Sequence, residues 1–180
     1  MIGKMRNVPW RSVVKAAATV AVLSPLMWAP QAAAASEASI SQDVSYRIVT
    51  FADKCLTVRN ESTEDGALID QYPCRGLSAQ RFTFHSVSGG RWEIRTFTNK
   101  CLTVWNESTA DSALIDQYHC VDLVAQKFRI RPLEDGRVEI LTFVDKCFTV
   151  RDGSTADSAL IDQYPCRDLY AQRFRLEPVS

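Results

Sequence analysis

The segment Lys54-Cys-Leu-Thr-Val58 recurs as Lys100-Cys-Leu-Thr-Val104 and as Lys146-Cys-Phe-Thr-Val150, each time 46 residues further along the chain. Two later segments keep the same period. In the first copy they read Ala67-Leu-Ile-Asp-Gln-Tyr-Pro-Cys74 and Ala79-Gln-Arg-Phe82. A period without gaps across so many positions does not arise by chance, so the sequence indicates three copies of one structural unit.

Each unit is predicted to contain four short strands. In the first unit they cover residues 46–51, 55–59, 67–74 and 80–87, which are rich in Val, Ile, Thr, Phe and Tyr and are bounded by turn residues. No segment of the repeats has a convincing helical period. A linear solenoid would need capping units with a polar outer face, but the first and last units are as apolar as the middle one. The sequence therefore predicts an all-β fold in which twelve strands close into a barrel with pseudo-threefold symmetry.

The first 35 residues have a different composition from the rest. They contain four bases and no acid, an apolar run from Ala16 to Ala29, and then the small-residue stretch Ala32–Ala35. This order is typical of a secretory signal peptide. The alternative is an uncleaved membrane anchor, although the apolar run contains Pro25 and is short for a spanning helix. We expect residues 1–35 to be a signal peptide and residues 36–45 a short linker.

Charge and residue types disfavour several function classes, although the numerous carboxylates leave a glycosidase-like acid/base pair open. The whole chain has 21 bases and 21 acids, and removal of the first 35 residues leaves 17 bases against 21 acids. The remaining chain is mildly acidic and offers no basic surface for nucleic acid. The two histidines, His85 and His119, fit no nucleophile or metal pattern. We therefore expect a secreted, monomeric protein with no membrane span, no catalytic residues and no cofactor.

The six cysteines occupy two places in each unit, 19 residues apart. If the repeats are equivalent, three choices join each first cysteine to a second one, and the choice within a unit closes the shortest loops. A metal site is the rival interpretation, but exported chains favour disulfides and no C-x-x-C pair is present.

The recurring pattern C-[LF]-T-V … Q-Y-x-C … Q-x-F resembles the ricin B-chain type β-trefoil lectin family, which includes the trefoil carbohydrate-binding modules of secreted glycosidases. The resemblance covers residues 46–180, with repeats at about 46–91, 92–137 and 138–180. It implies a β-trefoil with one shallow sugar site in each repeat. It also implies disulfides within the repeats, which pair Cys55 with Cys74, Cys101 with Cys120 and Cys147 with Cys166.

The same resemblance, together with residue chemistry, predicts the sugar-site residues. The aromatic two positions before the second cysteine is a tyrosine, and the glutamine of the family's Q-x-W motif is retained, with phenylalanine replacing its tryptophan. The family's usual aspartate is replaced by threonine and its asparagine by alanine, whereas an aspartate lies two residues before each tyrosine. An aromatic face and a fixed carboxylate are what a sugar site needs. The predicted carbohydrate-binding residues are Thr57, Asp70, Tyr72 and Gln80, then Thr103, Asp116, Tyr118 and Gln126, then Thr149, Asp162, Tyr164 and Gln172.

Each of these positions also has a purely structural interpretation. The glutamines tie backbone groups in a turn, the tyrosines pack, and Asp70 pairs with Arg59 or Arg75 as a solvated ion pair. The second repeat departs from the others by placing Trp105, His119 and Val121 where they have arginine, proline and arginine. Trp105 is either an exposed stacking platform or a cover for one edge of the barrel.

Two functions of different classes remain. The first is a secreted carbohydrate-binding β-trefoil that binds a polysaccharide or surface glycan at several sites. The alternative is a trefoil that has lost sugar binding and acts as an inhibitor or protein-interaction module. The triplicated Asp-Gln-Tyr segment favours the first, because an inhibitory loop does not require symmetry.

Overall fold

The computed structural model describes residues 40–42 and 44–179. The predicted signal peptide and part of the predicted linker lie outside the described residues. In the part of the chain that the structure describes, no helix is both long enough and apolar enough to cross a membrane.

The described chain consists of strands joined by turns, six of which form single 3₁₀ turns. The twelve strands are β1 (Ser45–Val49), β2 (Lys54–Val58), β3 (Ala67–Pro73), β4 (Phe82–Val87), β5 (Arg91–Arg95), β6 (Cys101–Val104), β7 (Ala113–Tyr118), β8 (Arg129–Pro132), β9 (Val138–Leu141), β10 (Lys146–Val150), β11 (Ala159–Pro165) and β12 (Arg175–Val179). The predicted all-β fold with four strands in each repeat is confirmed.

Six strands form a closed barrel. Strand β1 pairs with both β12 and β4, β4 pairs with β5, and β8 pairs with β9. The bridges Trp92–Phe128 and Val138–Phe174 complete the ring by joining β5 to the start of β8 and β9 to the start of β12. Closure removes the exposed strand edges that an open sheet would leave.

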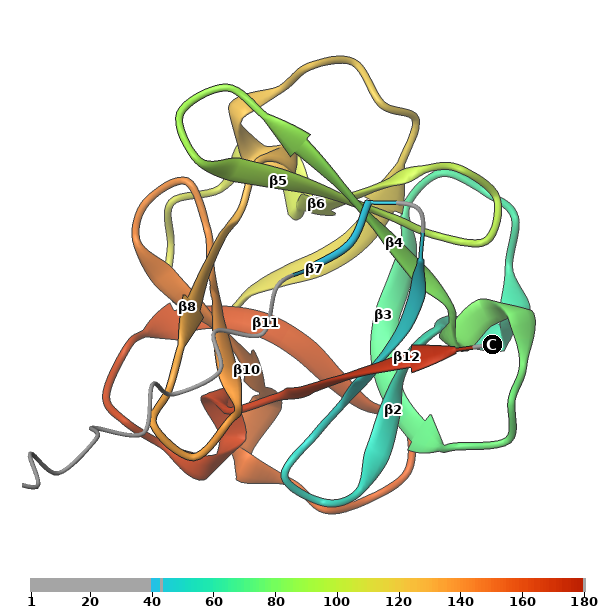
Figure 1. Ribbon diagram of the computed structural model, residues 1–180, viewed down its shortest axis with the longest axis vertical. Coiled ribbons are helices and arrows are strands. Elements are labelled where there is room, and N and C mark those ends of the chain that lie inside the picture. The colour runs from blue at the N-terminus through green and yellow to red at the C-terminus, as the bar shows by residue number, and fades with distance from the viewer. Residues whose placement is uncertain (1–39, 43, 180) are drawn as a thin grey trace, which may run out of the picture. The chain divides into compact units, whose positions relative to one another are not determined.

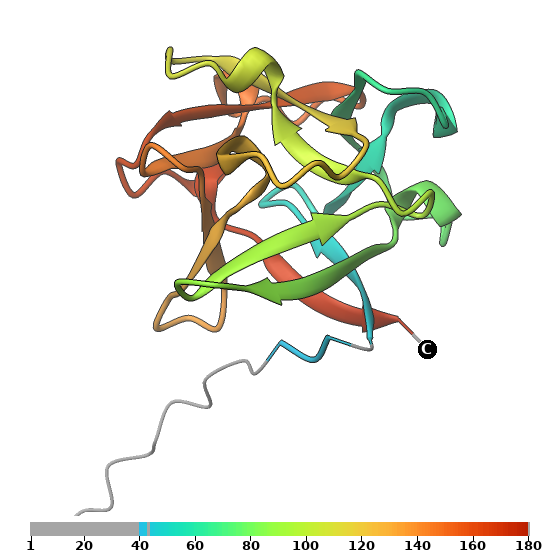
Figure 2. The same cartoon turned by 90° about the horizontal axis from the view of Figure 1, so that it is seen from above.

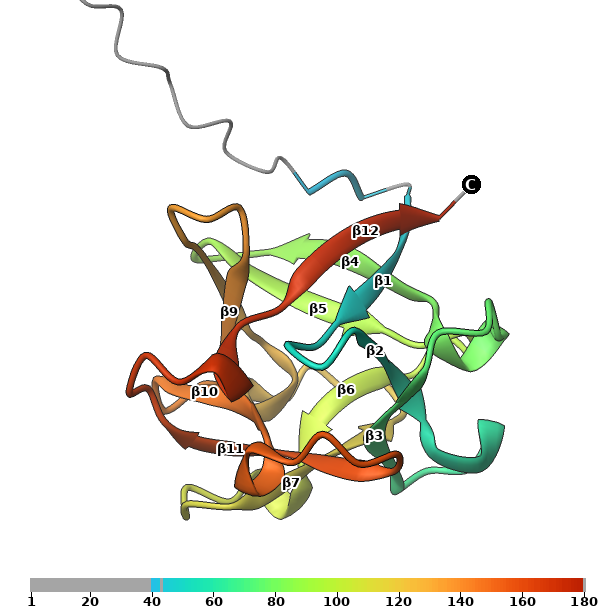
Figure 3. The same cartoon turned by 90° about the horizontal axis from the view of Figure 1, so that it is seen from below.

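The other six strands form three hairpins, β2–β3, β6–β7 and β10–β11, which cap one end of the barrel. Their second strands β3, β7 and β11 pair with one another around the threefold axis. Figure 1 looks along this axis and shows the three repeats as three lobes around a common centre. The side views in Figures 2 and 3 separate the two ends, with β3, β7 and β11 at one end and β1, β4 and β12 at the other in Figure 3.

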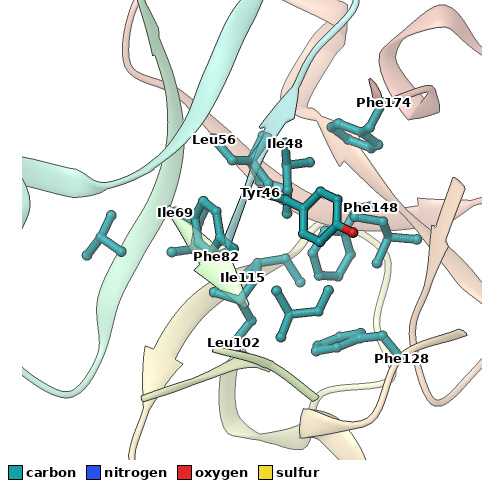
Figure 4. Packing of buried hydrophobic residues seen from close by; sticks show 14 of the residues in the cluster. Tyr46, Ile48, Leu56, Ile69, Phe82, Leu102, Ile115, Phe128, Phe148 and Phe174 are labelled. Atoms are coloured by element: carbon teal, nitrogen blue, oxygen red, sulfur yellow. The ribbon is translucent and has the colours of Figure 1, made fainter. Parts of the chain in front are cut away.

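The core lies inside the barrel and under the hairpins. It is built from equivalent side chains of the three repeats, such as Phe82, Phe128 and Phe174, which are at most 1% exposed. Figure 4 shows these rings in one cluster with Leu56, Leu102 and Phe148. Alternation along each strand sends these side chains inward and their neighbours outward. The expectation that the phenylalanine of the Q-x-F motif belongs to the core is therefore confirmed.

The three predicted disulfides are present, and each joins the first strand of a hairpin to a cysteine just beyond the end of its second strand. Each pair of cysteines has a Cα–Cα distance of 5.1 Å. A bond that closes a loop of this size contributes about 3 kcal/mol to stability.

Strand boundaries were predicted for the first repeat, and most of the observed ends differ from them by one or two residues. The fourth strand of the first repeat was expected to begin at Gln80, but residues Ser78–Gln80 form a 3₁₀ turn and β4 begins at Phe82. The same turn contains Gln126 and Gln172. The side-chain oxygen of each glutamine accepts a hydrogen bond from a nearby backbone amide. This bond fixes the turn where a strand would be fixed by pairing with its neighbour.

Candidate functional site

Each repeat carries one surface hollow at the side of its hairpin. We name them hollow 1, hollow 2 and hollow 3 after the repeat whose threonine, aspartate and tyrosine line them. Hollow 1 has a volume of ≈ 480 Å³ and contains Thr57, Asp70 and Tyr72. Hollow 2 (≈ 390 Å³) contains Thr103, Asp116 and Tyr118, and hollow 3 (≈ 660 Å³) contains Thr149, Asp162 and Tyr164.

The hairpin register explains why these three side chains meet. In β2 and β3, Thr57 lies directly opposite Asp70, and Cys55 lies opposite Tyr72. Asp70 and Tyr72 are two residues apart on one strand, so they share a face. The same register places Thr103 opposite Asp116 and Thr149 opposite Asp162. The structure therefore brings together nine of the twelve predicted site residues, three in each hollow.

The remaining three predicted residues, Gln80, Gln126 and Gln172, lie beneath the hollows and do not line them. Each is completely buried. Gln80 donates from Nε2 to the Pro73 carbonyl and to Thr57 Oγ1, and its Oε1 accepts from the Arg75 amide. The other two make the equivalent bonds. The prediction that these glutamines contact a ligand is corrected, because their amide groups instead hold the turn and the threonine in place.

The threonines are part of the floor of the hollows. Thr57 is 4% exposed, and its hydroxyl donates to the Cys55 carbonyl while accepting from Gln80. Thr103 and Thr149 make the same two bonds. Because the hydroxyl hydrogen is already used, the fixed polar group that a hollow offers to a ligand is chiefly its aspartate.

The three aspartates are buried carboxyl groups with raised pKa values. Burial raises the pKa of Asp70 to about 6, although the guanidinium of Arg59, 3.9 Å from its Oδ2, opposes the rise. Burial also raises the pKa of Asp162, although Arg151 Nε donates a 3.0 Å hydrogen bond to it. Loss of hydration penalises a charged carboxylate, and a nearby guanidinium restores part of that loss. Of the two predicted partners of Asp70, the structure shows Arg59, but the carboxyl group is buried and the pair is not a solvated one.

Asp116 lacks the arginine that its two counterparts have. Burial raises its pKa to about 7, a hydrogen bond from its own backbone opposes the rise, and the charge of Asp65 adds a smaller rise. Its Oδ1 is buried and has no hydrogen-bond partner among the described residues. A buried polar atom without a partner is uncommon in folded proteins and marks a place where a ligand group can bind.

The tyrosine rings also differ between repeats. The guanidinium of Arg75 lies 5.2 Å from the ring centre of Tyr72, and that of Arg167 lies 5.4 Å from the ring centre of Tyr164. In repeat 2 the equivalent position is Val121, and Tyr118 is 37% exposed. Its ring contacts the ring of His119 at a centroid distance of 4.0 Å.

The turn after each first hairpin strand completes the hollow. Asn60, Asn106 and Asp152 have left-handed backbone conformations with φ between 51° and 58°, and all three line a hollow. Asparagine and aspartate tolerate this conformation better than most residues. The asparagines at positions 60 and 106 therefore meet a conformational requirement of the turn.

A neighbouring repeat supplies the remaining wall, which sequence reasoning missed. Gly66 of repeat 1 lines hollow 2, Ser112 of repeat 2 lines hollow 3, and Ser158 of repeat 3 lines hollow 1. Buried glutamines fix these loops: Gln117 Nε2 donates to the carbonyls of Ser62 and Glu64, both at 2.9 Å. Gln71 and Gln163 do the same for the loops that contain Ser158 and Ser112. The sequence offered one indication of this role, because these glutamines recur at the same position of each repeat.

Three further aromatic side chains line the hollows, and one of them is Phe51 in hollow 3. Trp105 lines hollow 2 and is 41% exposed. A Cβ atom added to Gly66 would come 3.4 Å from its ring, so the glycine leaves room for it. Tyr170, which was not predicted, lines hollow 3 and is 71% exposed.

The family model for ricin-type β-trefoil lectin domain-like proteins matches residues 38–118 and 78–143. The chain belongs to this family. Among solved structures, this ricin-type trefoil is similar to ThreeFoil, a designed threefold symmetric protein, with 30% sequence identity and a TM-score of 0.74 over 75% of this chain and 99% of that one. No curated protein sequence matches it.

Two natural proteins match at lower sequence identity. An exo-β-1,3-galactanase from Clostridium thermocellum, 1,3Gal43A, is 26% identical with a TM-score of 0.75, and the match covers 78% of the trefoil but only 31% of the galactanase chain. A ricin B-like lectin of Macrolepiota procera, solved in complex with lactose, is 17% identical with a TM-score of 0.63 over 77% of this chain and 98% of that one. The latter likeness is one of fold alone.

Proposed function

We propose that the chain is a secreted, multivalent carbohydrate-binding protein that holds glycan units in hollows 1, 2 and 3 and carries out no catalysis. The observation that supports the proposal is the threefold repetition of one arrangement, in which a buried carboxyl group and a tyrosine ring line the same surface hollow. Sugars offer hydroxyls to a fixed acceptor and a C–H face to an aromatic ring.

Repetition also favours binding over catalysis. A glycosidase needs one pair of carboxyl groups with different roles. Here the same aspartate occurs once in each hollow, which suits three weak sites on a rigid body that gain affinity together on a polymeric ligand. Family membership supports a carbohydrate target. The galactanase named above is, by its name, an enzyme that acts on a polysaccharide.

Secretion is part of the proposal. The three disulfides are consistent with an extracellular location, because such bonds persist in oxidising compartments. The predicted signal peptide supports the same location. Mass analysis of the protein from the culture medium of its producing cells tests this part, since it should lack about the first 35 residues.

The sugar-binding proposal is tested by screening the oxidised protein against a glycan array and insoluble polysaccharides. A variant with Tyr72, Tyr118 and Tyr164 all changed to alanine should lose binding, because each ring supplies the stacking face of one hollow. Arg81→Ala, an exposed change outside the hollows, is the control. Binding that survives in the triple variant would refute the assignment of the sites. Absence of any glycan binding by the folded protein, together with stoichiometric inhibition of a protease, would favour the interaction-module function.

A further inference from the structure

Two arginines in each of repeats 1 and 3 supply a positive charge to the hollow of that repeat. Arg59 and Arg151 lie beside Asp70 and Asp162, and Arg75 and Arg167 lie over the tyrosine rings. In chemical terms, the guanidinium groups occupy the two places where a cation would bind, one at the carboxylate and one at the ring face.

Repeat 2 has neither arginine. The position of Arg59 and Arg151 is occupied by Trp105, and the position of Arg75 and Arg167 by Val121. The first change is accommodated by Gly66 in the neighbouring loop, where the other repeats have serine. Neither the carboxylate nor the Tyr118 ring of hollow 2 therefore has an arginine beside it. The Tyr118 ring contacts the His119 ring instead, and an indole ring is added to the hollow.

The charged groups around hollow 2 favour a positive ligand. Three acids line it, Asp65, Glu107 and Asp116, and no lysine or arginine is among its lining residues. Asp65 is already balanced by Lys100 at 2.6 Å and by His119 at 3.0 Å. Asp116 has no such partner, and its Oδ1 makes no hydrogen bond among the described residues.

We propose that hollow 2 binds the protonated amine of an amino sugar, whereas hollows 1 and 3 bind neutral sugars. An ammonium group brings donors for the carboxylate of Asp116 and a charge that the faces of Trp105 and Tyr118 attract. That the amine belongs to a sugar rests on the proposed function. That the ligand is positively charged rests on the missing arginines and the unpaired carboxylate.

The test is a titration of the protein with glucosamine, N-acetylglucosamine and glucose, followed by backbone amide chemical shifts. At about pH 7 most of an α-amino-type group is protonated. We expect glucosamine to bind in hollow 2 at least about tenfold more tightly than either neutral sugar, because charge-assisted hydrogen bonds are about twice as strong as neutral ones. Hollows 1 and 3 should show no such preference.

Two variants locate the effect. Asp116→Asn removes the charge with little change of shape, and Trp105→Arg gives repeat 2 the residue that repeats 1 and 3 contain. Both should abolish the preference for glucosamine, whereas Asp162→Asn, the matched change in hollow 3, should leave it intact. Trp105 is partly exposed, so its replacement tests the proposal even if Asp116→Asn fails to fold.

The outcomes separate this inference from the proposed function. Binding of all three sugars in hollow 2 with equal affinity, or a preference that survives both variants, would overturn the inference and leave carbohydrate binding intact. The inference would also be overturned if glucosamine shifted only amides that lie outside hollow 2. Absence of binding by any sugar in any hollow, in this titration and in the glycan screen, would overturn the proposed function and the inference with it.

Discussion

Replacing Asp116 by asparagine has a calculable effect on how stability depends on pH. Burial raises the pKa of Asp116 to about 7 in the folded protein, whereas an aspartate in the unfolded chain has a pKa of about 3.9. Between these values the folded state holds a proton that the unfolded state has lost. Stability due to this group therefore falls as the pH rises from about 4 to about 7 and is level above that range.

The magnitude follows from the same two pKa values. Between pH 5 and pH 8, ionisation of Asp116 should lower the free energy of unfolding by about 2.5 kcal/mol. Asparagine does not ionise, so the variant should lack this loss and gain relative stability at pH 8. The groups around the carboxyl support this direction, since Asp65 and Glu107 are acidic, and Lys100 and His119 are bound to Asp65.

Urea unfolding of the protein and of the Asp116→Asn variant at pH 5 and pH 8 measures the difference. At a typical dependence of about 1–3 kcal/mol per molar urea, the two midpoints should move apart by about 1 M or more between these pH values. Asp122→Asn, which changes an exposed carboxylate, is the control and should follow the unmodified protein. Parallel pH profiles for the protein and the Asp116 variant would show that this carboxyl group is not held in a desolvated, unpaired state.

Three further changes test the scaffold. Gln117→Ala leaves the backbone carbonyls of Ser62 and Glu64 without their donor and should lower the free energy of unfolding by about 1–3 kcal/mol in urea titrations; a loss below about 0.5 kcal/mol, the size of an ordinary surface change, would mean that the loop is held by other contacts. Replacing both Cys101 and Cys120 by alanine should cost about 3 kcal/mol, measured under oxidising conditions, and an unchanged midpoint would contradict the role given to this bond. Phe128→Ala should cost about 3–5 kcal/mol in thermal or urea unfolding, because the ring is fully buried, and a small effect would place it outside the core.

The fold could be predicted from the sequence because the repeats constrain one another. A strand, turn or cysteine that is ambiguous in one copy is supported by its counterparts in the other two. The pairing of the cysteines and the burial of the phenylalanines followed from that equivalence and from the family resemblance. Both are confirmed by the structure.

The candidate site could be predicted only in part. Local spacing places Asp70 and Tyr72 on one face of a strand, and the disulfide brings Thr57 beside them. Spacing within a repeat carries no information on the loop of the adjacent repeat, so the walls formed by Gly66 and Ser158 were not foreseen.

The glutamines show a second limit of sequence reasoning. A polar residue in a family motif is a reasonable candidate for ligand contact, but its burial depends on the whole fold. Gln80 and its two counterparts have no exposed surface and hold the threonine floor instead. Gln71, Gln117 and Gln163 are also buried, and each fixes the loop of a neighbouring repeat that borders the hollow of its own repeat. In both sets the amide group satisfies backbone atoms that the turns would leave unpaired.

The central claim is that the three hollows bind carbohydrate. The most direct measurement is a titration of the protein with a glycan found in the screen, with the position and stoichiometry of binding read from backbone amide shifts. The account predicts that the shifted amides cluster at β3, β7 and β11 and at the turns beside the three hollows, and that binding saturates at one sugar unit per hollow. Shifts that cluster elsewhere, such as the hollow lined by Arg91, Val124 and Phe143, would contradict it.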